Sequence, residues 1–359
     1  MPTRRVRVLV ADDSVIFRQA LTSILTADPA IELVGVVKNG REAVTWLRAH
    51  TADVVIMDVE MPELDGLGAL RELRAARCPA KVIMFSTLTQ RGSRAAVEAI
   101  TSGAVDCVAK PEGLGHLSAS IERIRAELLP RIKSIAASGR DASPPVSPSP
   151  APRRPVTPRL IVVGASTGGP NALFELLQAL PEELDTPIAI AQHMPPGFTR
   201  MLAERLAVAA RRPVIEASHD GRLSPGAIVL APGDQHLEVI STGGTLRTRL
   251  SRAAPVNQVR PSVDVLFASA ASATGPATLA VVLSGMGRDG ADGALTLAKA
   301  GAYVMVQDEA SSVVWGMPGA TARAGAAHQI GPIPQLARAL GSAHRTQSVP
   351  IRALIGDVA

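Results

Sequence analysis

Aromatic side chains are scarce in this sequence, which contains 5 Phe, 2 Trp and 1 Tyr among its 359 residues. Proteins that bind single-stranded nucleic acid stack bases on aromatic rings, and proteins that bind duplexes concentrate Lys and Arg on one part of the chain. Here 37 basic residues are opposed by 32 acidic ones, and the small surplus is spread thinly along the chain. The composition therefore argues against a nucleic-acid partner.

Cysteines and long apolar runs are also few. The two cysteines, Cys78 and Cys107, lie in separate expected strand regions without partner His spacing, which suits neither a zinc site nor a disulfide framework. No run reaches the roughly 18 apolar residues of a membrane span, and the N-terminal apolar run is too short for a signal peptide. We therefore expect a cytoplasmic protein without membrane insertion.

A Pro-rich stretch divides the chain. From Gly139 to Pro158 the sequence GRDASPPVSPSPAPRRPVTP lacks apolar periodicity, and its composition favours extended conformations. With 47% hydrophobic residues, the remainder can bury two cores. We predict one domain over residues 1–134, a linker over 135–158, a second domain over 159–345, and a fraying tail over 346–359.

Short apolar runs predict two parallel sheets. VRVLVA, ELVGVV, DVVIMD, KVIMFS and AVDCVA alternate with helical stretches before the linker, which predicts a five-stranded parallel sheet covered on both faces. After the linker, RLIVVG, PIAIAQH, AIVLAP, TLAVVLSG and AYVMVQ predict a second, doubly wound α/β domain. The segments HLEVI and TLRTRL flank Ser241-Thr242-Gly243-Gly244, which predicts a β-hairpin that forms an antiparallel edge.

Charged residues follow several of the expected strands of the first domain. Asp12 and Asp13 come after the first strand, Asp58 ends the third, and Lys110 ends the fifth. These strand ends share one crevice in a parallel sheet, where clustered carboxylates repel one another unless a divalent cation is present. Oxygen ligands of this kind suit Mg²⁺. The alternative is that Asp12 or Asp13 caps the helix that begins near Ser14. A helix cap would explain one of these aspartates, but it does not explain three aspartates and a lysine at neighbouring strand ends.

Over roughly residues 4–128 the sequence resembles the flavodoxin-like receiver domain of bacterial two-component response regulators. The matching segments are VLVADDS, MDVEMPELDG, Ser86-Thr87 and VAKP. The resemblance implies that Asp58 accepts a phosphoryl group from a histidine kinase. It also implies a set of Mg²⁺ ligands, namely Asp12, Asp13, Asp58 and the main chain of Glu60.

The same resemblance implies two residues that respond to the phosphoryl group. Lys110 would contact it, and Ser86 would follow it as the hydroxyl switch. The loop from Leu88 to Ser93 is longer than in many receivers, so Thr87 stays open as a substitute for Ser86.

The second domain begins with a strand, a Gly-rich turn and a helix in RLIVVGASTGGPNAL. Gly164 to Gly168 satisfies G-x-S-x-G, a turn that holds a nucleophilic hydroxyl, here that of Ser166, above a parallel sheet. A dinucleotide site is the alternative, but it requires G-x-G-x-x-G and an acidic residue at the end of the next strand. This chain has G-x-x-x-G-G, and Asp185 precedes that strand. The sequence therefore favours a nucleophilic serine.

A serine nucleophile needs a base and usually an acid that orients the base. His193 ends PIAIAQH and Asp289 follows TLAVVLSGMGR, so both lie at the carboxyl ends of strands. His219 competes by position, whereas His236 begins a strand and is expected at the other rim. The order Ser, His, Asp differs from that of the α/β-hydrolases. The remaining histidines are expected at the surface: His50, His116, His328 and His344.

The whole chain resembles the chemotaxis response regulator protein-glutamate methylesterases (CheB). The matching segments are GASTGGP, QHMPPGFT, APGDQHLEV, RPSVDVLF, LSGMGRDGADG and VVWGMPGA. The resemblance implies a catalytic triad of Ser166, His193 and Asp289, with the main-chain N–H of Met286 in the oxyanion hole and no cofactor for the ester chemistry. By analogy with other nucleophile turns, Thr167 could donate a second N–H.

This resemblance implies phosphorylation-activated hydrolysis of glutamyl methyl esters on methyl-accepting chemotaxis receptors, which gives glutamate and methanol, together with deamidation of receptor glutamines. The expected partners are these receptors and a histidine kinase, and the expected state is a monomer. We also expect the unphosphorylated receiver to shield the Ser166 crevice, because the linker permits contact. The alternative is a response regulator with a non-catalytic, protein-binding output domain. A transcriptional output is disfavoured because no helix-turn-helix pattern is present.

Overall fold

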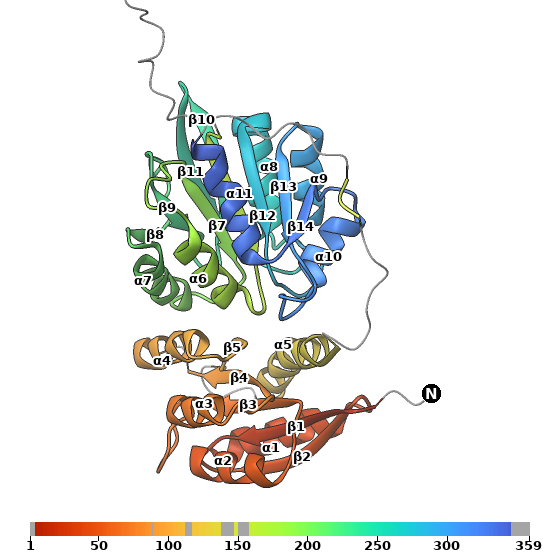
Figure 1. The fold of residues 1–359 in the computed structure, drawn as a ribbon. Helices are drawn as coiled ribbons and strands as arrows, with labels where there is room; N and C mark the ends of the chain where they lie inside the picture. The colour runs from red at the N-terminus through yellow and green to blue at the C-terminus, as the bar shows by residue number, and fades with distance from the viewer. Residues whose placement is uncertain (1–3, 88, 112–116, 138–146, 150–157, 346–359) are drawn as a thin grey trace, which may run out of the picture.

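The chain folds into two α/β units that are stacked on one another (Figure 1). This computed structural model describes residues 4–87, 89–111, 117–137, 147–149 and 158–345. Within these ranges, no helix is long and apolar enough to cross a membrane. The expectation for the tail over residues 346–359 lies outside the described residues.

The N-terminal unit is built on the predicted five-stranded parallel sheet, whose order is β2-β1-β3-β4-β5. β3 is buried along its whole length because helices cover both faces of the sheet. The strands are β1 Val6–Ala11, β2 Ile31–Val37, β3 Val54–Asp58, β4 Lys81–Ser86 and β5 Asp106–Ala109. The helices are α1 Val15–Thr26, α2 Gly40–Ala49, α3 Gly66–Ala75, α4 Gln90–Thr101 and α5 Leu117–Ala137.

The C-terminal unit contains a seven-stranded parallel sheet in the order β14-β13-β12-β6-β7-β9-β8. The chain order reverses between β6 and β12, and this switch point is where doubly wound folds form their ligand crevice. The strands are β6 Leu160–Ala165, β7 Ile188–Gln192, β8 Val214–Glu216, β9 Ile228–Leu230, β12 Thr278–Val282, β13 Tyr303–Gln307 and β14 Gln329–Gly331. The helices are α6 Gly169–Ala179, α7 Phe198–Ala210, α8 Val263–Thr274, α9 Ala291–Lys299, α10 Gly316–Arg323 and α11 Ile333–Arg345, with a 3₁₀ turn at Gly275–Ala277.

The predicted hairpin is confirmed as β10 (His236–Thr242) paired antiparallel with β11 (Thr245–Ser251). It forms a two-stranded sheet of its own rather than an added strand of the seven-stranded sheet. The reason is that the alternate residues Leu237 and Val239 are buried in the apolar cluster that also contains α8 residues such as Leu266. Gly243 and Gly244 both adopt positive φ, as a tight hairpin turn requires.

The two units share apolar cores. One cluster contains Val97 and Ile100 of α4 together with Met201 and Leu202 of α7. A second cluster contains α5 residues such as Ile132 together with Val314 of the C-terminal unit. The units therefore meet through α4 and α5, and not through charged side chains alone.

Local details refine the expected linker and cysteine positions. Helix α5 continues to Ala137, with Ile135 buried, so the first residues of the expected linker segment are helical. Ser149 donates from its N–H to Ala327 O at 2.8 Å, which holds this part of the segment against the C-terminal unit. The expectation that both cysteines lie in strand regions is wrong for Cys78, which lies in the loop before β4, whereas Cys107 lies in β5.

Candidate active site

The Gly-rich turn that carries Ser166 connects β6 to α6. The N–H of Ser166 donates to Ser284 O at 3.0 Å, which fastens the turn to the chain that leaves β12. Gly168 adopts a φ of 76°, and a Cβ there would lie 2.8 Å from Ser284 Oγ. Gly285 is equally restricted, because its Cβ would lie 2.9 Å from Ser166 Cβ. Glycines at these positions let two loops meet at the serine.

His193 follows β7 and lies beside this turn, because its N–H donates to Ala165 O at 3.1 Å. The amide of Gln192 donates to Ser166 O at 3.0 Å and to His193 O at 3.1 Å. The imidazole Nε2 of His193 lies 2.8 Å from Asp289 Oδ2. The structure therefore brings together the three residues that the sequence singled out, at the carboxyl ends of β6, β7 and β12.

Asp289 is 3% exposed and accepts hydrogen bonds from the first turn of α8 as well as from His193. The N–H of Val263 donates to Oδ2 at 2.6 Å, and the hydroxyl of Ser262 donates to Oδ1 at 2.7 Å. Burial alone favours the protonated acid, but the hydrogen bond from His193, followed by those from Asn257 and Ser262, holds the pKa of Asp289 well below its usual range. Asp289 is therefore a carboxylate whose position is fixed.

Sequence reasoning missed a second carboxylate in this site. Asp264 is 9% exposed and accepts a hydrogen bond from Gly293 N at 2.6 Å. Burial raises the pKa of Asp264 to about 6, and the nearby Asp289 charge acts in the same direction. Asn257 donates to both carboxylates. The available signal was Ser-Val-Asp at positions 262–264, because Ser and Asp before an apolar run mark the start of a helix.

Two main-chain N–H groups beside the serine have no acceptor among the residues that the structure describes. They belong to Thr167, which follows Ser166, and to Met286, in the loop after β12. Met286 also packs against the apolar cluster that contains Ile132 of α5. Unpaired N–H groups near a nucleophile can bind a developing oxyanion.

The competing histidines are placed elsewhere. The His219 ring lies 3.2 Å from Leu250 O, on the exposed side of the hairpin. The expectation that His236 points to the other rim is wrong, since its buried Nδ1 accepts a hydrogen bond from Ser262 N at 3.2 Å. His236 therefore supports the loop that holds Asp289, because β10 packs on α8 and not in the main sheet.

In the N-terminal unit, the carboxylates of Asp12, Asp13 and Asp58 offer oxygens within 4.8 Å of one another. Lys110 Nζ lies 2.8 Å from Asp12 Oδ2 and 2.6 Å from Asp58 Oδ2. Burial raises the pKa of Asp58 to about 6, against the attraction of Lys110. The N-cap residue of α1 is Ser14 and not Asp12 or Asp13, although Asp12 Oδ1 accepts a hydrogen bond from Ser14 N at 2.9 Å. An oxygen-only set with clustered negative charge fits a hard divalent cation.

The other residues expected around this cluster differ in exposure. Ser86 is 1% exposed, and its hydroxyl lies 3.4 Å from Thr87 O. Thr87 Oγ1 lies 3.1 Å from the hydroxyl of Thr89, the N-cap of α4. Glu60 is exposed. The contacts of these residues do not favour Ser86 over Thr87 as the switch, so both stay predictions.

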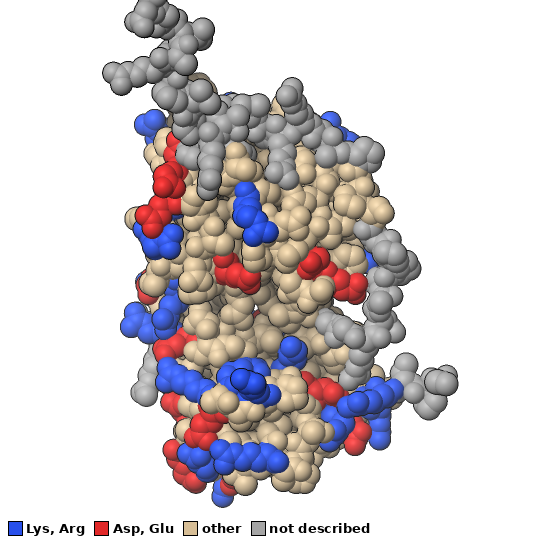
Figure 2. Space-filling view, in the orientation of Figure 1, with Lys and Arg blue, Asp and Glu red and all other residues tan. Residues whose placement is uncertain are grey.

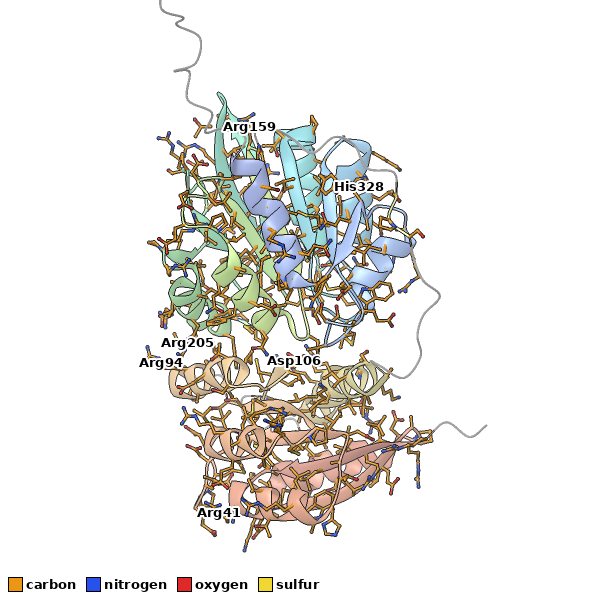
Figure 3. All side chains as sticks on the ribbon, viewed as in Figure 1. Arg41, Arg94, Asp106, Arg159, Arg205 and His328 are labelled. Atoms are coloured by element: carbon orange, nitrogen blue, oxygen red, sulfur yellow. The ribbon has the colours of Figure 1, made fainter. Side chains whose placement is uncertain are left out.

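The N-terminal unit reaches the serine turn directly. Thr167 Oγ1 donates to Asp106 Oδ2 at 2.7 Å, and Gly168 N donates to Val105 O at 3.0 Å. Asn171 Nδ2 donates to Ala104 O at 2.9 Å. Figure 3 places Asp106 at the junction of the units, with Arg94 and Arg205 near its edge. There Arg205 pairs with Glu98 at 3.3 Å and Arg94 with Glu204 at 3.6 Å.

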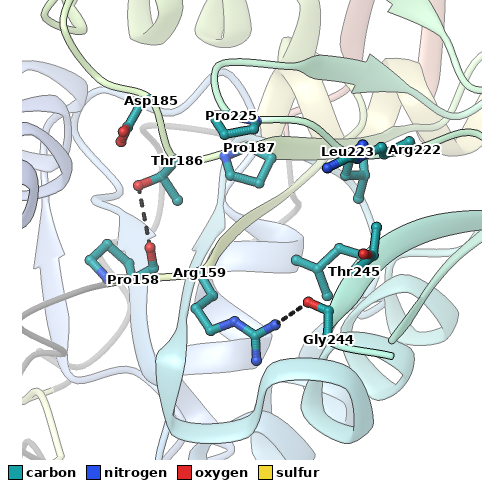
Figure 4. A pocket seen from close by; sticks show the side chains of 11 residues that line it. Pro158, Arg159, Asp185, Thr186, Pro187, Arg222, Leu223, Pro225, Gly244 and Thr245 are labelled. Carbon is teal, nitrogen blue, oxygen red and sulfur yellow. Dashed lines mark hydrogen bonds between the residues drawn. The ribbon is translucent and has the colours of Figure 1, made fainter. Parts of the chain in front are cut away.

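A separate pocket of about 310 Å³ lies at the opposite end of the C-terminal sheet (Figure 4). Arg159 and Pro187 line it, and they directly precede β6 and β7. Ser166 and His193 follow the same strands, so the length of a strand separates this pocket from these two residues. On the face shown in Figure 2, basic and acidic side chains are interspersed, without a broad patch of one sign.

Comparison with known proteins identifies relatives of both units. Residues 161–340 match the family model of the CheB methylesterase, and residues 8–122 match that of the response regulator receiver domain. The protein-glutamate methylesterase/protein-glutamine glutaminase of Nocardioides sp. is 47% identical over 97% of this chain and 99% of its own length. A protein-glutamate methylesterase/protein-glutamine glutaminase 2 of Pseudomonas aeruginosa is 44% identical over 93% of this chain and 96% of its own.

A solved structure is similar to the C-terminal unit. The crystal structure of the Thermotoga maritima CheB methylesterase catalytic domain superposes with a TM-score of 0.51 and 36% sequence identity. The match covers 52% of this chain and 98% of that chain.

Proposed function

The chain belongs to the CheB methylesterase family and carries a response regulator receiver domain, and on this basis we propose which of its residues perform each step. The protein hydrolyses glutamyl methyl esters of chemotaxis receptors to glutamate and methanol, under response-regulator control, and is also a protein-glutamine glutaminase. We propose that the receiver extends from residue 1 to Ala137, where α5 ends and not at the expected 134, that the linker runs from there to 158, and that the esterase covers 159–345.

Ser166 attacks the γ-carbonyl of the ester while His193 accepts its proton. Asp289 engages Nε2, so Nδ1 is the imidazole nitrogen left for this proton. The Ser166 hydroxyl makes no hydrogen bond to the residues described, so it must turn toward the ring. The tetrahedral intermediate expels methanol, which takes the proton from His193, and water then cleaves the acyl-enzyme by the same route. A glutamine side chain would release ammonia instead.

The oxyanion is assigned to the N–H groups of Met286 and Thr167. Neither N–H has an acceptor among the residues described, which supports this role. Donors that are already in place stabilise the transition state most, because they need no reorganisation during the reaction. The observation that carries the esterase assignment is the 2.8 Å contact between His193 and Asp289 beside the serine turn.

The receiver is assigned the regulatory chemistry. Asp58 accepts the phosphoryl group, and Asp12, Asp13, Asp58 and the main chain of Glu60 would hold Mg²⁺, which would supply positive charge against the phosphoryl oxygens. Lys110, now paired with Asp58, would move to the phosphoryl group. Ser86 is the proposed switch hydroxyl, with Thr87 as its substitute. A histidine kinase is the proposed donor.

Shielding of the crevice by the unphosphorylated receiver is the proposed mode of control. The hydrogen bonds from Thr167, Gly168 and Asn171 to residues 104–106 support it, because they lie beside Ser166. The proposal also includes a cytoplasmic location, action as a monomer, and methylated receptors as substrate.

The test is release of labelled methanol from methylated receptor membranes by the full-length protein, with Mg²⁺ and acetyl phosphate. Ser166→Ala and His193→Ala each lower the rate of methanol release by several orders of magnitude while the protein remains folded, because such residues act as a unit. His219→Ala is the matched control and retains activity. Near-normal turnover by Ser166→Ala would show that the nucleophile lies elsewhere and would favour a non-catalytic output domain.

A further inference from the structure

We propose that Asn257 is a positioning residue of the esterase, whose amide orients Asp289 toward His193 and bridges Asp289 to the second buried carboxylate, Asp264. This inference rests on the proposed role of Asp289 and goes beyond it, because Asn257 lies outside the triad and the oxyanion donors.

A single nitrogen makes both contacts. Asn257 Nδ2 lies 2.9 Å from Asp289 Oδ1 and 2.7 Å from Asp264 Oδ2. An amide nitrogen carries two hydrogens, so it can give one to each carboxylate. Asn257 adopts a φ of 52°, a left-handed conformation that Asn tolerates better than most residues. The turn is closed by paired hydrogen bonds between Val256 and Val259, of 3.0 and 3.2 Å, which fix the direction of the amide.

The two carboxylates are close enough to interact. Asp264 N donates to Asp289 Oδ1 at 3.3 Å, and each residue is at most 9% exposed. Buried like charges repel strongly because little solvent screens them. The charged and titratable groups near the pair are few: His193 contacts Asp289, His236 acts through Ser262, and Arg288 pairs with Asp292 on the adjoining loop and helix.

Loss of the amide has a defined consequence. Asp289 would lose one of the donors to Oδ1, and the two carboxylates would lose the donor that they share. The carboxylate would turn or gain a proton, and His193 would lose its orientation and the stabilisation of its charged form. With the amide in place burial raises the pKa of Asp264 to about 6, and loss of the Asn257 hydrogen bond raises this pKa further, so the repulsion appears and grows as the pH rises above about 6. A residue that acted only on the stability of the loop would not produce that dependence.

The experiment measures kcat and KM of the full-length protein on methylated receptor membranes, with Mg²⁺ and acetyl phosphate, from about pH 5.5 to about pH 8. Asn257→Ala lowers kcat about 10-fold or more at the upper end, with KM unchanged, and the defect shrinks toward the lower end. The double variant Asn257→Ala/Asp264→Asn recovers at least about threefold of the lost kcat, since it removes the repelling charge. Gln258→Ala is the matched control, because Gln258 is the next residue, is exposed and has a φ of 65°.

Four results of this experiment would overturn the proposed role of Asn257. Wild-type kcat in Asn257→Ala, a rise in KM alone, or a double variant no better than Asn257→Ala overturns the proposal. A pH-independent loss also overturns it. The Ser166→Ala protein is assayed in parallel: activity there would refute the proposed triad itself, whereas its inactivity together with a normal Asn257→Ala protein would refute only the role of Asn257.

Discussion

Thr167 donates a 2.7 Å hydrogen bond from its hydroxyl to Asp106, so the residue after the proposed nucleophile is tied to strand β5 of the receiver. The Asp106 carboxylate also lies 3.3 Å from Arg131 Nε of α5. The strand that ends near Lys110 is therefore the strand that contacts the turn carrying Ser166, so β5 connects the proposed phosphorylation site to this turn.

Removal of this contact should release the esterase. Asp106→Ala breaks a buried hydrogen bond to a charged group, and such bonds are worth enough to shift docking about tenfold or more. We expect basal methanol release by the unphosphorylated protein to rise about 10-fold, with little change in the phosphorylated protein. Glu32→Ala, on the exposed side of β2, is the control. Unchanged basal release would mean that Asp106 does not hold the receiver in place.

A fragment that begins near Pro155 should behave as an unshielded esterase. Its basal activity is expected to exceed that of the unphosphorylated full-length protein and to ignore acetyl phosphate. The assay compares both proteins at equal concentration on the same membranes. If the fragment is the less active of the two, shielding is wrong, and the receiver must help assemble the site or deliver it to the receptor.

Asp58 gives a prediction about stability. Its pKa is raised by burial to about 6 in the folded protein, so the unfolded chain releases this proton first as the pH rises. Asp58 makes its whole contribution to the free energy of unfolding below about pH 4, which is near the pKa of an ordinary Asp. This contribution is lost by about pH 6. Without Mg²⁺, Asp58→Asn should be about 1–3 kcal/mol more stable than the wild type above pH 6 and equal to it near pH 4.

Calorimetry of both proteins in a chelating buffer measures this difference across the pH range. Phosphorylation is followed on the same samples after Mg²⁺ and acetyl phosphate are added, and Asp58→Asn should form no acyl phosphate. Asp12→Ala should weaken the Mg²⁺ dependence in the wild-type background. A stability difference that is constant with pH would show that Asp58 does not carry the raised pKa.

Gly285→Ala tests the close approach of the two loops. The added methyl group would lie 2.3 Å from Met317 Sδ and 2.9 Å from Ser166 Cβ, so the Met317 side chain must shift and either the loop of Gly285 or the serine turn must also move. Overpacking of this kind costs about 1–3 kcal/mol, and we expect a loss of kcat of at least about 10-fold. Thermal unfolding and kcat are measured on the same preparation. Normal kcat would mean that the loop gives way without moving Ser166.

Much of the fold, and the proximity of the candidate site residues, could be predicted because parallel sheets place strand ends at one edge. Asp58 ends one apolar run and His193 follows another, and the sequence alone shows these positions. Asn257 could not be found in this way, because it lies in a turn between β11 and α8 and reaches Asp289 only through the fold. The contact of Asp106 depends on docking of the two units, which no local pattern encodes. His236 was misplaced because the hairpin forms its own sheet.

The apolar cluster that runs from α4 into α7 has a consequence for unfolding. Val97, Ile100, Met201 and Leu202 belong to one continuous core, although a Pro-rich stretch separates their units in the sequence. Units that share a core melt together, whereas units joined only by a tether melt independently. The unphosphorylated protein should give one cooperative unfolding transition in calorimetry, and the phosphorylated protein should give two. The number of transitions would therefore report whether phosphorylation has separated the two units.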